Sequence, residues 1–221
     1  MRHVVIGLGS GRCGTMSLAV LLESQDGVVC THELGRPFPW NGSAWLVGHR
    51  LSHVITDAGE NDIGGDIAYW YLPQVDHIHD FLDGEVRFVC LKREREACLK
   101  SMKNWNSWLG INPYQTHNAS KWRRSIWDVT LPTFDFCTIE SAMEKYYDGY
   151  YQLAEHFEEA YPGKFKIFDM DDLNTDDGVR GILDFVEVRN PKIITGIRKN
   201  TNDERLEKAN RLNEAVPDGV T

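Results

Sequence analysis

The chain has 221 residues, with 24 lysines and arginines against 33 aspartates and glutamates, and a formal net charge of −9. Hydrophobic residues make up 42% and charged residues 26%, which is ordinary for a globular protein that buries a sizeable core. The acidic balance argues against non-specific nucleic-acid binding, which needs a broad basic surface, and against a long polyanionic partner.

The cysteines and the start of the chain bear on cellular location. No C-x-x-C pair occurs among the five cysteines, which are Cys13, Cys30, Cys90, Cys98 and Cys137. An odd count, with members inside apparent core strands, fits a reducing compartment. The first expected strand begins at His3, which leaves no room for a secretory signal, and no apolar run reaches the ~20 residues of a membrane span. We therefore expect a cytoplasmic protein without a transmembrane segment.

Short apolar runs alternate with helical patterns along the chain. In chain order they predict strand 3–8, helix 14–24, strand 27–31, a mixed region 36–61, strand 62–67, helix 70–82, strand 86–91, helix 94–105, an aromatic-rich stretch 105–137, helix 138–160, strand 164–168, helix 176–187, and a polar tail 188–221 with a helix at 203–214. This alternation implies one domain over residues 1–221, a three-layer α/β/α fold with a central parallel sheet. Ligands of such folds bind beyond the carboxyl ends of the strands.

The first expected strand leads into a glycine-rich turn, residues 9–15, that opens the first helix. Glycines let the backbone approach a ligand closely, and the N–H groups of a helix start favour anions. Arg12 in this turn is a cation that opposes the helix dipole unless an anion lies between them. Cys13 is either a reactive thiol, because a helix start lowers the pKa of a thiol, or a small residue that fills a tight turn. The turn predicts a site for a phosphate- or sulfate-bearing ligand.

One competing pattern is the nucleotide triphosphatase loop, G-x-x-x-x-G-K-S/T. Gly9 and Gly14 have its glycine spacing, but Thr15 and Met16 stand where the lysine and the hydroxyl residue belong. A glycine turn with a solvated arginine and no ligand is the plain alternative to any anion site.

A second competing pattern is the dinucleotide-binding turn, G-x-G-x-x-G. Gly9, Gly11 and Gly14 match it, and Glu33 ends a second apolar stretch about 20 residues further on. Arg12 argues against this interpretation, because small residues are usual against the pyrophosphate.

A second basic segment follows the strand expected at 86–91. Residues 92–96 open a helix with the letters KRERE, and Ser101 follows Arg93 by eight positions. Basic residues at a helix start have the wrong sign for the helix dipole, although the two glutamates partly offset this. Residues 94 and 101 are seven positions apart and therefore share a helix face. Arg93, at the entrance of the helix, can then bend toward a ligand that Ser101 reaches. A solvated helix start of mixed charge is the alternative.

Residues 10–18 resemble the 5′-phosphosulfate loop of sulfotransferases that use 3′-phosphoadenosine 5′-phosphosulfate (PAPS), whose pattern is roughly G-R/K-S/G-G-T-x-x-L. Cys13 stands where serine is common. In this family a strand leads to an arginine and, eight positions later, to a serine, and these two hold the 3′-phosphate. Arg93 and Ser101 have that spacing, although the usual Asp-Pro after the arginine is absent.

Two further segments, 65–73 and 165–173, resemble the strand before the 3′-phosphate strand and the late strand with its acidic turn. They stand in the family's order, so the resemblance extends over roughly residues 3–187. It implies a fold like that of P-loop nucleotide-binding proteins and the transfer of a sulfuryl group to a hydroxyl or an amine.

The resemblance also implies how the donor is bound. The residues expected at its 5′ end are Ser10, Gly11, Arg12, Cys13, Gly14, Thr15 and Met16. Arg12 would stabilise the leaving phosphate, while Arg93 and Ser101 hold the adenosine end, and adenosine 3′,5′-bisphosphate is the product. Arg198 and Lys199 resemble a late basic segment that closes over the 3′-phosphate in some members. We expect no metal requirement, because positioning and charge stabilisation carry such a transfer and the sequence has no H-x-x-x-H or C-x-x-C ligand set.

A base must take the acceptor's proton. The segment 31–33 follows the second strand and opens onto the same sheet edge as the turn. In the family branch of tyrosylprotein and glycan sulfotransferases a glutamate near this strand end is the base, and Glu33 lies 21 residues after Arg12. Other branches use a histidine, and His32 is adjacent. Successive residues of an extended chain point opposite ways, so one of the two faces the acceptor, and Glu33 is the favoured candidate. A solvated strand end is the alternative.

The stretch 105–137 holds aromatic and basic residues that suit an acceptor lid, since aromatic faces pack against sugar rings or lipid-like groups. These residues are Trp105, Trp108, Tyr114, Trp122, Arg123, Arg124 and Trp127. Aromatics that complete a core under a long loop would give the same pattern. The acceptor is expected to be a small molecule, a carbohydrate or a lipid headgroup. The rival functions are a nucleotide kinase or triphosphatase with an atypical loop, and a relative that binds nucleotide without catalysis.

Overall fold

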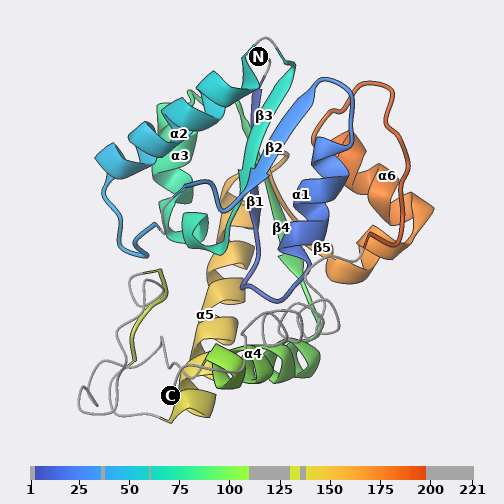
Figure 1. The fold of residues 1–221 in the computed structure, drawn as a ribbon. Helices are drawn as coiled ribbons and strands as arrows, with labels where there is room; N and C mark the ends of the chain where they lie inside the picture. Colours follow the sequence, from blue (N-terminus) through green and yellow to red (C-terminus); the bar gives the residue numbers. More distant parts are fainter. Residues whose placement is uncertain (1–2, 36–37, 60, 110–129, 135–137, 198–221) are drawn as a thin grey trace, which may run out of the picture.

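A computed structural model describes residues 3–35, 38–59, 61–109, 130–134 and 138–197 (Figure 1). The strands are β1 (His3–Leu8), β2 (Val28–His32), β3 (Ile63–Ile67), β4 (Val86–Lys92) and β5 (Phe165–Asp169). The helices are α1 (Thr15–Glu23), α2 (Ala44–Ala58), α3 (Val75–Phe81), α4 (Arg95–Leu109), α5 (Ile139–Ala160) and α6 (Asp176–Phe185), with short 3-10 helices η1 (Tyr69–Gln74) and η4 (Met170–Asn174).

The five strands form one sheet in the order β2-β3-β1-β4-β5, and every neighbouring pair is parallel. The chain leaves the central β1 toward β2, returns to β3, and then crosses to β4 and β5 on the other side. The direction of winding therefore reverses between β1 and β4. In open parallel sheets, ligands bind at such a reversal, outside the carboxyl ends of the strands.

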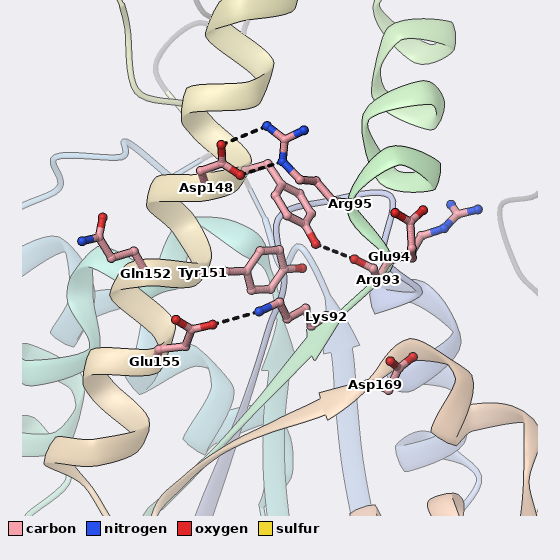
Figure 2. Close-up of a pocket in the computed structure, with 10 residues that line it drawn as sticks. Lys92, Arg93, Glu94, Arg95, Asp148, Tyr151, Gln152, Glu155 and Asp169 are labelled. Atoms are coloured by element: carbon pink, nitrogen blue, oxygen red, sulfur yellow. Dashed lines mark hydrogen bonds and ion pairs between the residues drawn. The ribbon is translucent and has the colours of Figure 1, made fainter.

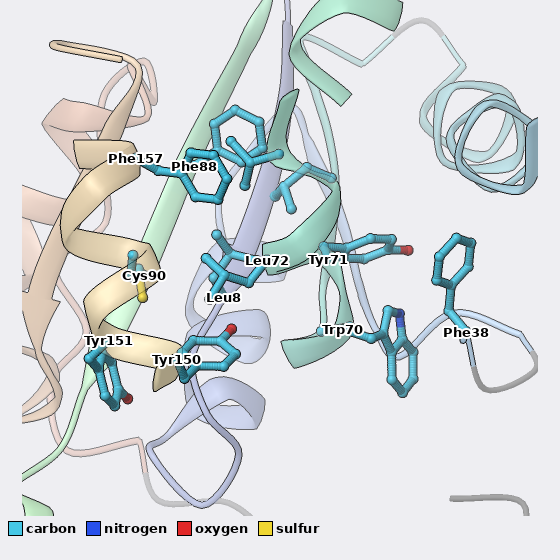
Figure 3. Close-up of a cluster of buried hydrophobic side chains, with 14 of the residues drawn as sticks. Leu8, Phe38, Trp70, Tyr71, Leu72, Phe88, Cys90, Tyr150, Tyr151 and Phe157 are labelled. Carbon is cyan, nitrogen blue, oxygen red and sulfur yellow. The ribbon is translucent and has the colours of Figure 1, made fainter. Parts of the chain in front are cut away.

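Two hydrophobic cores hold the layers together. Side chains alternate along β1, so that Val4, Ile6 and Leu8 face one core and Val5 faces the other. Helices α2, α3 and α5 cover the first face, and α1 and α6 cover the second (Figure 1). Figure 3 shows part of the first core, where aromatic side chains from η1 and α5 pack around Leu8. The predicted three-layer α/β/α fold with a parallel sheet is confirmed.

Two segments differ from the expected elements. The mixed region 36–61 contains α2, whose buried Val47, Leu51, Val54 and Ala58 recur at helical spacing. The helix expected at 70–82 is divided into η1 and α3. Pro73 lies inside η1, where a short 3-10 turn tolerates the missing backbone donor better than the interior of a long α-helix would.

Several expected segments fall wholly or partly outside the described residues. These are most of the stretch 105–137, the residues Cys137, Arg198 and Lys199, and the helix at 203–214. The described part of the tail, 188–197, has no regular secondary structure. Within the described ranges, no helix combines the length and the apolar character needed to cross a bilayer.

Candidate functional site

The turn after β1 has the left-handed backbone that its glycines allow. Positive φ angles occur at Gly11 (82°), Arg12 (61°) and Gly14 (89°), and Gly14 is the N-cap of α1. Such angles cost a residue with a side chain roughly 1 kcal/mol or more, so Arg12 is held in its position by the surrounding structure. A Cβ atom at Gly9 would lie 2.9 Å from the backbone oxygen of Leu91, so the turn packs tightly against the end of β4.

Two buried tyrosines of α5 hold this turn. The N–H of Gly9 donates to the hydroxyl of Tyr150 at 2.9 Å. The hydroxyl of Tyr151 donates to the carbonyl of Leu91 at 2.8 Å and lies 3.3 Å from the Ser10 Oγ. Burial raises the pKa of both phenols well above the usual value, so both stay protonated at neutral pH. Helix α5 therefore fixes the turn and the end of β4 as one unit.

Arg12, Arg93 and Ser101 are in direct contact. The Arg12 Nε donates to the Ser101 Oγ at 3.1 Å, and the Arg93 Nη1 donates to the backbone oxygen of Arg12 at 3.0 Å. The backbone oxygen of Arg93 in turn accepts from the hydroxyl of Tyr147 at 2.5 Å. Residues that were predicted to bind the two ends of the donor thus form one continuous polar cluster at the winding reversal.

The other cations of the basic segment 92–96 pair with carboxylates of α5 (Figure 2). Arg95 forms a bidentate pair with Asp148 at 2.8 and 2.9 Å, and Lys92 pairs with Glu155 at 2.8 Å. These pairs lie around a cavity of about 540 Å³ on the α5 side of β4, lined by Lys92, Arg93, Glu94, Arg95, Tyr147, Asp148, Tyr151, Gln152, Glu155 and Asp169. Among Lys92, Arg93 and Arg95, it is Arg93 that contacts the glycine turn, through the backbone oxygen of Arg12.

Cys13 is fully buried within the turn. Burial, and to a lesser degree the neighbouring Cys98, raises the pKa of its thiol to about 12. The interpretation as a reactive thiol is therefore wrong, because burial keeps the thiol protonated at neutral pH. Cys13 acts as a small residue that fills the space against Gly9.

The end of β2 lies beside the start of α1. The His32 Nε2 is 3.2 Å from the Thr15 Oγ1, and the Glu33 N–H donates to the Ile67 carbonyl at 3.1 Å. Glu33 has a φ of 55°, so the chain turns away from the sheet there. Burial first, and the charge of Asp66 second, raise the pKa of the Glu33 carboxyl to about 7. Burial lowers the pKa of His32, although Asp66 opposes this, so His32 is mainly neutral at pH 7.

Asp66 lies near the end of β3 with no exposed surface. Its Oδ1 accepts from the Thr31 hydroxyl at 2.8 Å and from the Leu34 N–H at 3.1 Å. Its Oδ2 accepts from the Tyr71 hydroxyl at 2.7 Å. No role was predicted for Asp66, although an aspartate inside an apolar strand, next to its carboxyl end, is a signal that the sequence contains.

One solved structure similar to this chain is that of a sulfotransferase from Alicyclobacillus acidocaldarius. The comparison covers 97% of this chain and 92% of that one, with a TM-score of 0.58 and 12% sequence identity. The chain has a sulfotransferase-like fold. At this identity the likeness concerns the fold and transfers no residue roles. No family model matches the chain, and no curated protein matches it in sequence.

Within the sulfotransferase-like fold, the described candidate residues gather at one edge of the sheet. They are Ser10, Gly11, Arg12, Cys13, Gly14, Thr15, Met16, His32, Glu33, Arg93 and Ser101. Arg198 and Lys199 are outside the described residues. Besides Asp66, Tyr150 and Tyr151 were not predicted; they form a pair one helical turn after the pair at 146–147. No group of three or more metal-ligating side chains occurs in the part of the chain that the structure describes.

Proposed function

We propose that the protein transfers the sulfuryl group of PAPS to an acceptor hydroxyl or amine. The observation that carries this proposal is the contact of Arg12 with Ser101 and Arg93, placed at the winding reversal of a sulfotransferase-like fold. Two guanidinium groups near a helix start, whose free N–H groups favour anions, would suit a ligand that carries a 5′-phosphosulfate and a 3′-phosphate.

The donor is proposed to lie across this cluster. The amides at the start of α1, from Cys13 to Met16, and the guanidinium of Arg12 bind the 5′-phosphosulfate. Arg93 and Ser101 bind the 3′-phosphate, and Arg198 and Lys199 are proposed to close over it. The bond from sulfur to the bridging oxygen breaks during the transfer, and Arg12 stabilises the negative charge that develops on that oxygen.

The acceptor's proton is proposed to pass to Glu33. The acceptor oxygen or nitrogen attacks sulfur in line with the leaving phosphate, and Glu33 accepts its proton, so the products are a sulfated acceptor and adenosine 3′,5′-bisphosphate. A carboxyl group with a pKa of about 7 is well matched to general base catalysis near neutral pH. His32, which is also mainly neutral there, is the alternative base.

The acceptor class is proposed as a small molecule, a carbohydrate or a lipid headgroup, bound under the aromatic stretch 105–137 by a protein of the cytoplasm. No metal is required, because charge on the leaving group is met by Arg12 and backbone amides. The rival triphosphatase would lack its lysine at position 15, and the rival non-catalytic relative would bind the bisphosphate without transfer.

Release of adenosine 3′,5′-bisphosphate from PAPS, measured with a panel of hydroxyl and amine acceptors, tests the proposal. We expect acceptor-dependent release without added metal. Arg12→Ala should lower kcat by about 10²- to 10³-fold with little change in bisphosphate affinity, because its charge matters most in the transition state. Arg12→Lys, which keeps the charge but loses the fork that reaches Ser101, is the matched control and should recover part of the rate. Turnover of ATP with Mg²⁺ in place of PAPS would contradict the proposal.

A further inference from the structure

Asp66 is a buried carboxylate whose partners surround the candidate base. It lies in β3, the strand hydrogen-bonded to β2, and in the register of the sheet it pairs with Thr31. A charge without solvent is costly to bury unless several donors compensate it. The Thr31 hydroxyl, the Leu34 N–H and the Tyr71 hydroxyl are such donors, at 2.8, 3.1 and 2.7 Å.

These contacts bracket the two candidate bases along the chain. Thr31 precedes the His32–Glu33 pair and Leu34 follows it, and both donate to the same oxygen, Oδ1. One atom of Asp66 therefore fixes both ends of a four-residue segment. The second oxygen, Oδ2, accepts from the Tyr71 hydroxyl of η1 and, at 3.3 Å, from the same Leu34 N–H, so the carboxylate itself cannot rotate freely.

We propose that Asp66 is a positioning residue that sets both the backbone turn and the charge environment of Glu33 and His32. This inference rests on the proposed function of Glu33 as the base. Asp66 makes no contact with the reacting atoms in this account. It acts by holding the turn in which Glu33 has its positive φ, and by placing a fixed negative charge behind the pair.

Groups from four neighbouring elements lie against this segment. Asp66 belongs to β3, Tyr71 to η1 and Arg50 to α2, and Thr15 of α1 contacts His32. The Arg50 guanidinium approaches Gly35, just after the segment. Burial first, and Asp66 second, raise the pKa of Tyr71 well above its usual value, and Arg50 opposes this. Asp66 is the charged group that acts on both Glu33 and His32, in each case favouring the protonated form.

The test is the pH dependence of kcat/KM for Asp66→Asn. The asparagine keeps the shape and the acceptor for Leu34 but removes the charge. The wild-type rate should rise through about pH 7 as Glu33 loses its proton. In the variant this rise should move to lower pH by about half a unit to one unit, because a negative neighbour is lost. A rise that stays at the wild-type pH would overturn the inference.

Thr31→Val is the matched control, because it removes a donor to Asp66 and keeps the charge. Its rise with pH should stay at the wild-type position. If Asp66→Asn does not fold, Tyr71→Phe perturbs the same carboxylate from its other oxygen and should lower kcat more than it changes KM. Equal kcat and KM in Tyr71→Phe and wild type would contradict the positioning role.

A readout without catalysis separates this inference from the proposed function. The imidazole of His32 can be titrated by NMR, with its signal assigned by its loss in His32→Gln. In Asp66→Asn the pKa of His32 should be lower than in the wild type, because Asp66 favours the imidazolium. If PAPS is not turned over but the His32 titration moves, the proposed function fails, while the electrostatic effect of Asp66 on the His32–Glu33 pair stands. An unmoved titration would contradict the proposed role of Asp66.

Discussion

Glu33 is a carboxyl group in a place that disfavours its charged form. Its backbone is left-handed, its side chain is largely buried, and Asp66 lies behind it. Burial and Asp66 raise the pKa of this proposed base toward neutral pH, and they cost stability when the carboxyl ionises. Sites that are shaped for chemistry commonly carry such a cost.

This cost is measurable as a pH dependence of unfolding. The folded-state pKa of about 7 lies above the ordinary 4.5, so the native protein loses stability as pH rises from about 4.5 through 7. The glutamine of Glu33→Gln does not ionise, so the variant does not lose this stability. Its free energy of unfolding minus that of the wild type should therefore increase by about 2 kcal/mol between pH 5 and pH 8. Urea unfolding at the two values measures it, with exposed Glu159→Gln as the control. A constant difference would show that Glu33 is not perturbed.

The candidate residues differ in how far the sequence could predict them. Arg12, Arg93 and Ser101 belong to local patterns of glycine, charge and strand ends, and the structure brings these three together. From the sequence alone, Cys13 could be interpreted as a reactive thiol, because its burial depends on segments that are distant along the chain. Asp66 was missed for the same reason, since its partners come from β2, η1 and the loop after β2.

At the scale of elements, α5 is the support of the glycine turn. Tyr150 and Tyr151 reach Gly9 and Ser10 across 141 positions of sequence, and such long-range contacts leave no local trace in the chain. The division of the 70–82 segment and the formation of α2 likewise depend on packing against the sheet. The strands and the other helices were predictable, because their apolar periodicity is local.

Tyr150→Phe tests this support. It leaves the Gly9 N–H without its hydroxyl partner, which should destabilise the protein by about 1–3 kcal/mol and weaken binding of adenosine 3′,5′-bisphosphate. Tyr161→Phe is the matched control, because the Tyr161 hydroxyl contacts Asp76, outside the candidate site, and its removal should leave ligand affinity unchanged. Urea unfolding and calorimetry measure both quantities. If the two variants bind the bisphosphate equally, α5 does not shape the turn.

At the scale of the whole molecule, the strand order places the two basic segments together. The sequence predicted a parallel sheet from its alternating elements, and the order β2-β3-β1-β4-β5 then puts the ends of β1 and β4 side by side. The order itself was not predictable from periodicity, because each strand is compatible with several neighbours. The fold thereby turns two separate sequence patterns into one candidate anion site.

The central claim is that this site holds an adenosine carrier with charges at its 3′ and 5′ positions. Calorimetry with adenosine 3′,5′-bisphosphate tests it most directly, with ATP and NAD as competitors, with and without Mg²⁺. We predict metal-independent binding of the bisphosphate, preferred over ATP and NAD, and about 5- to 150-fold weaker binding by Arg93→Ala, the loss expected for a charged hydrogen bond of 1–3 kcal/mol. Tighter binding of ATP with Mg²⁺ or of NAD, or an unchanged affinity in Arg93→Ala, would contradict the account.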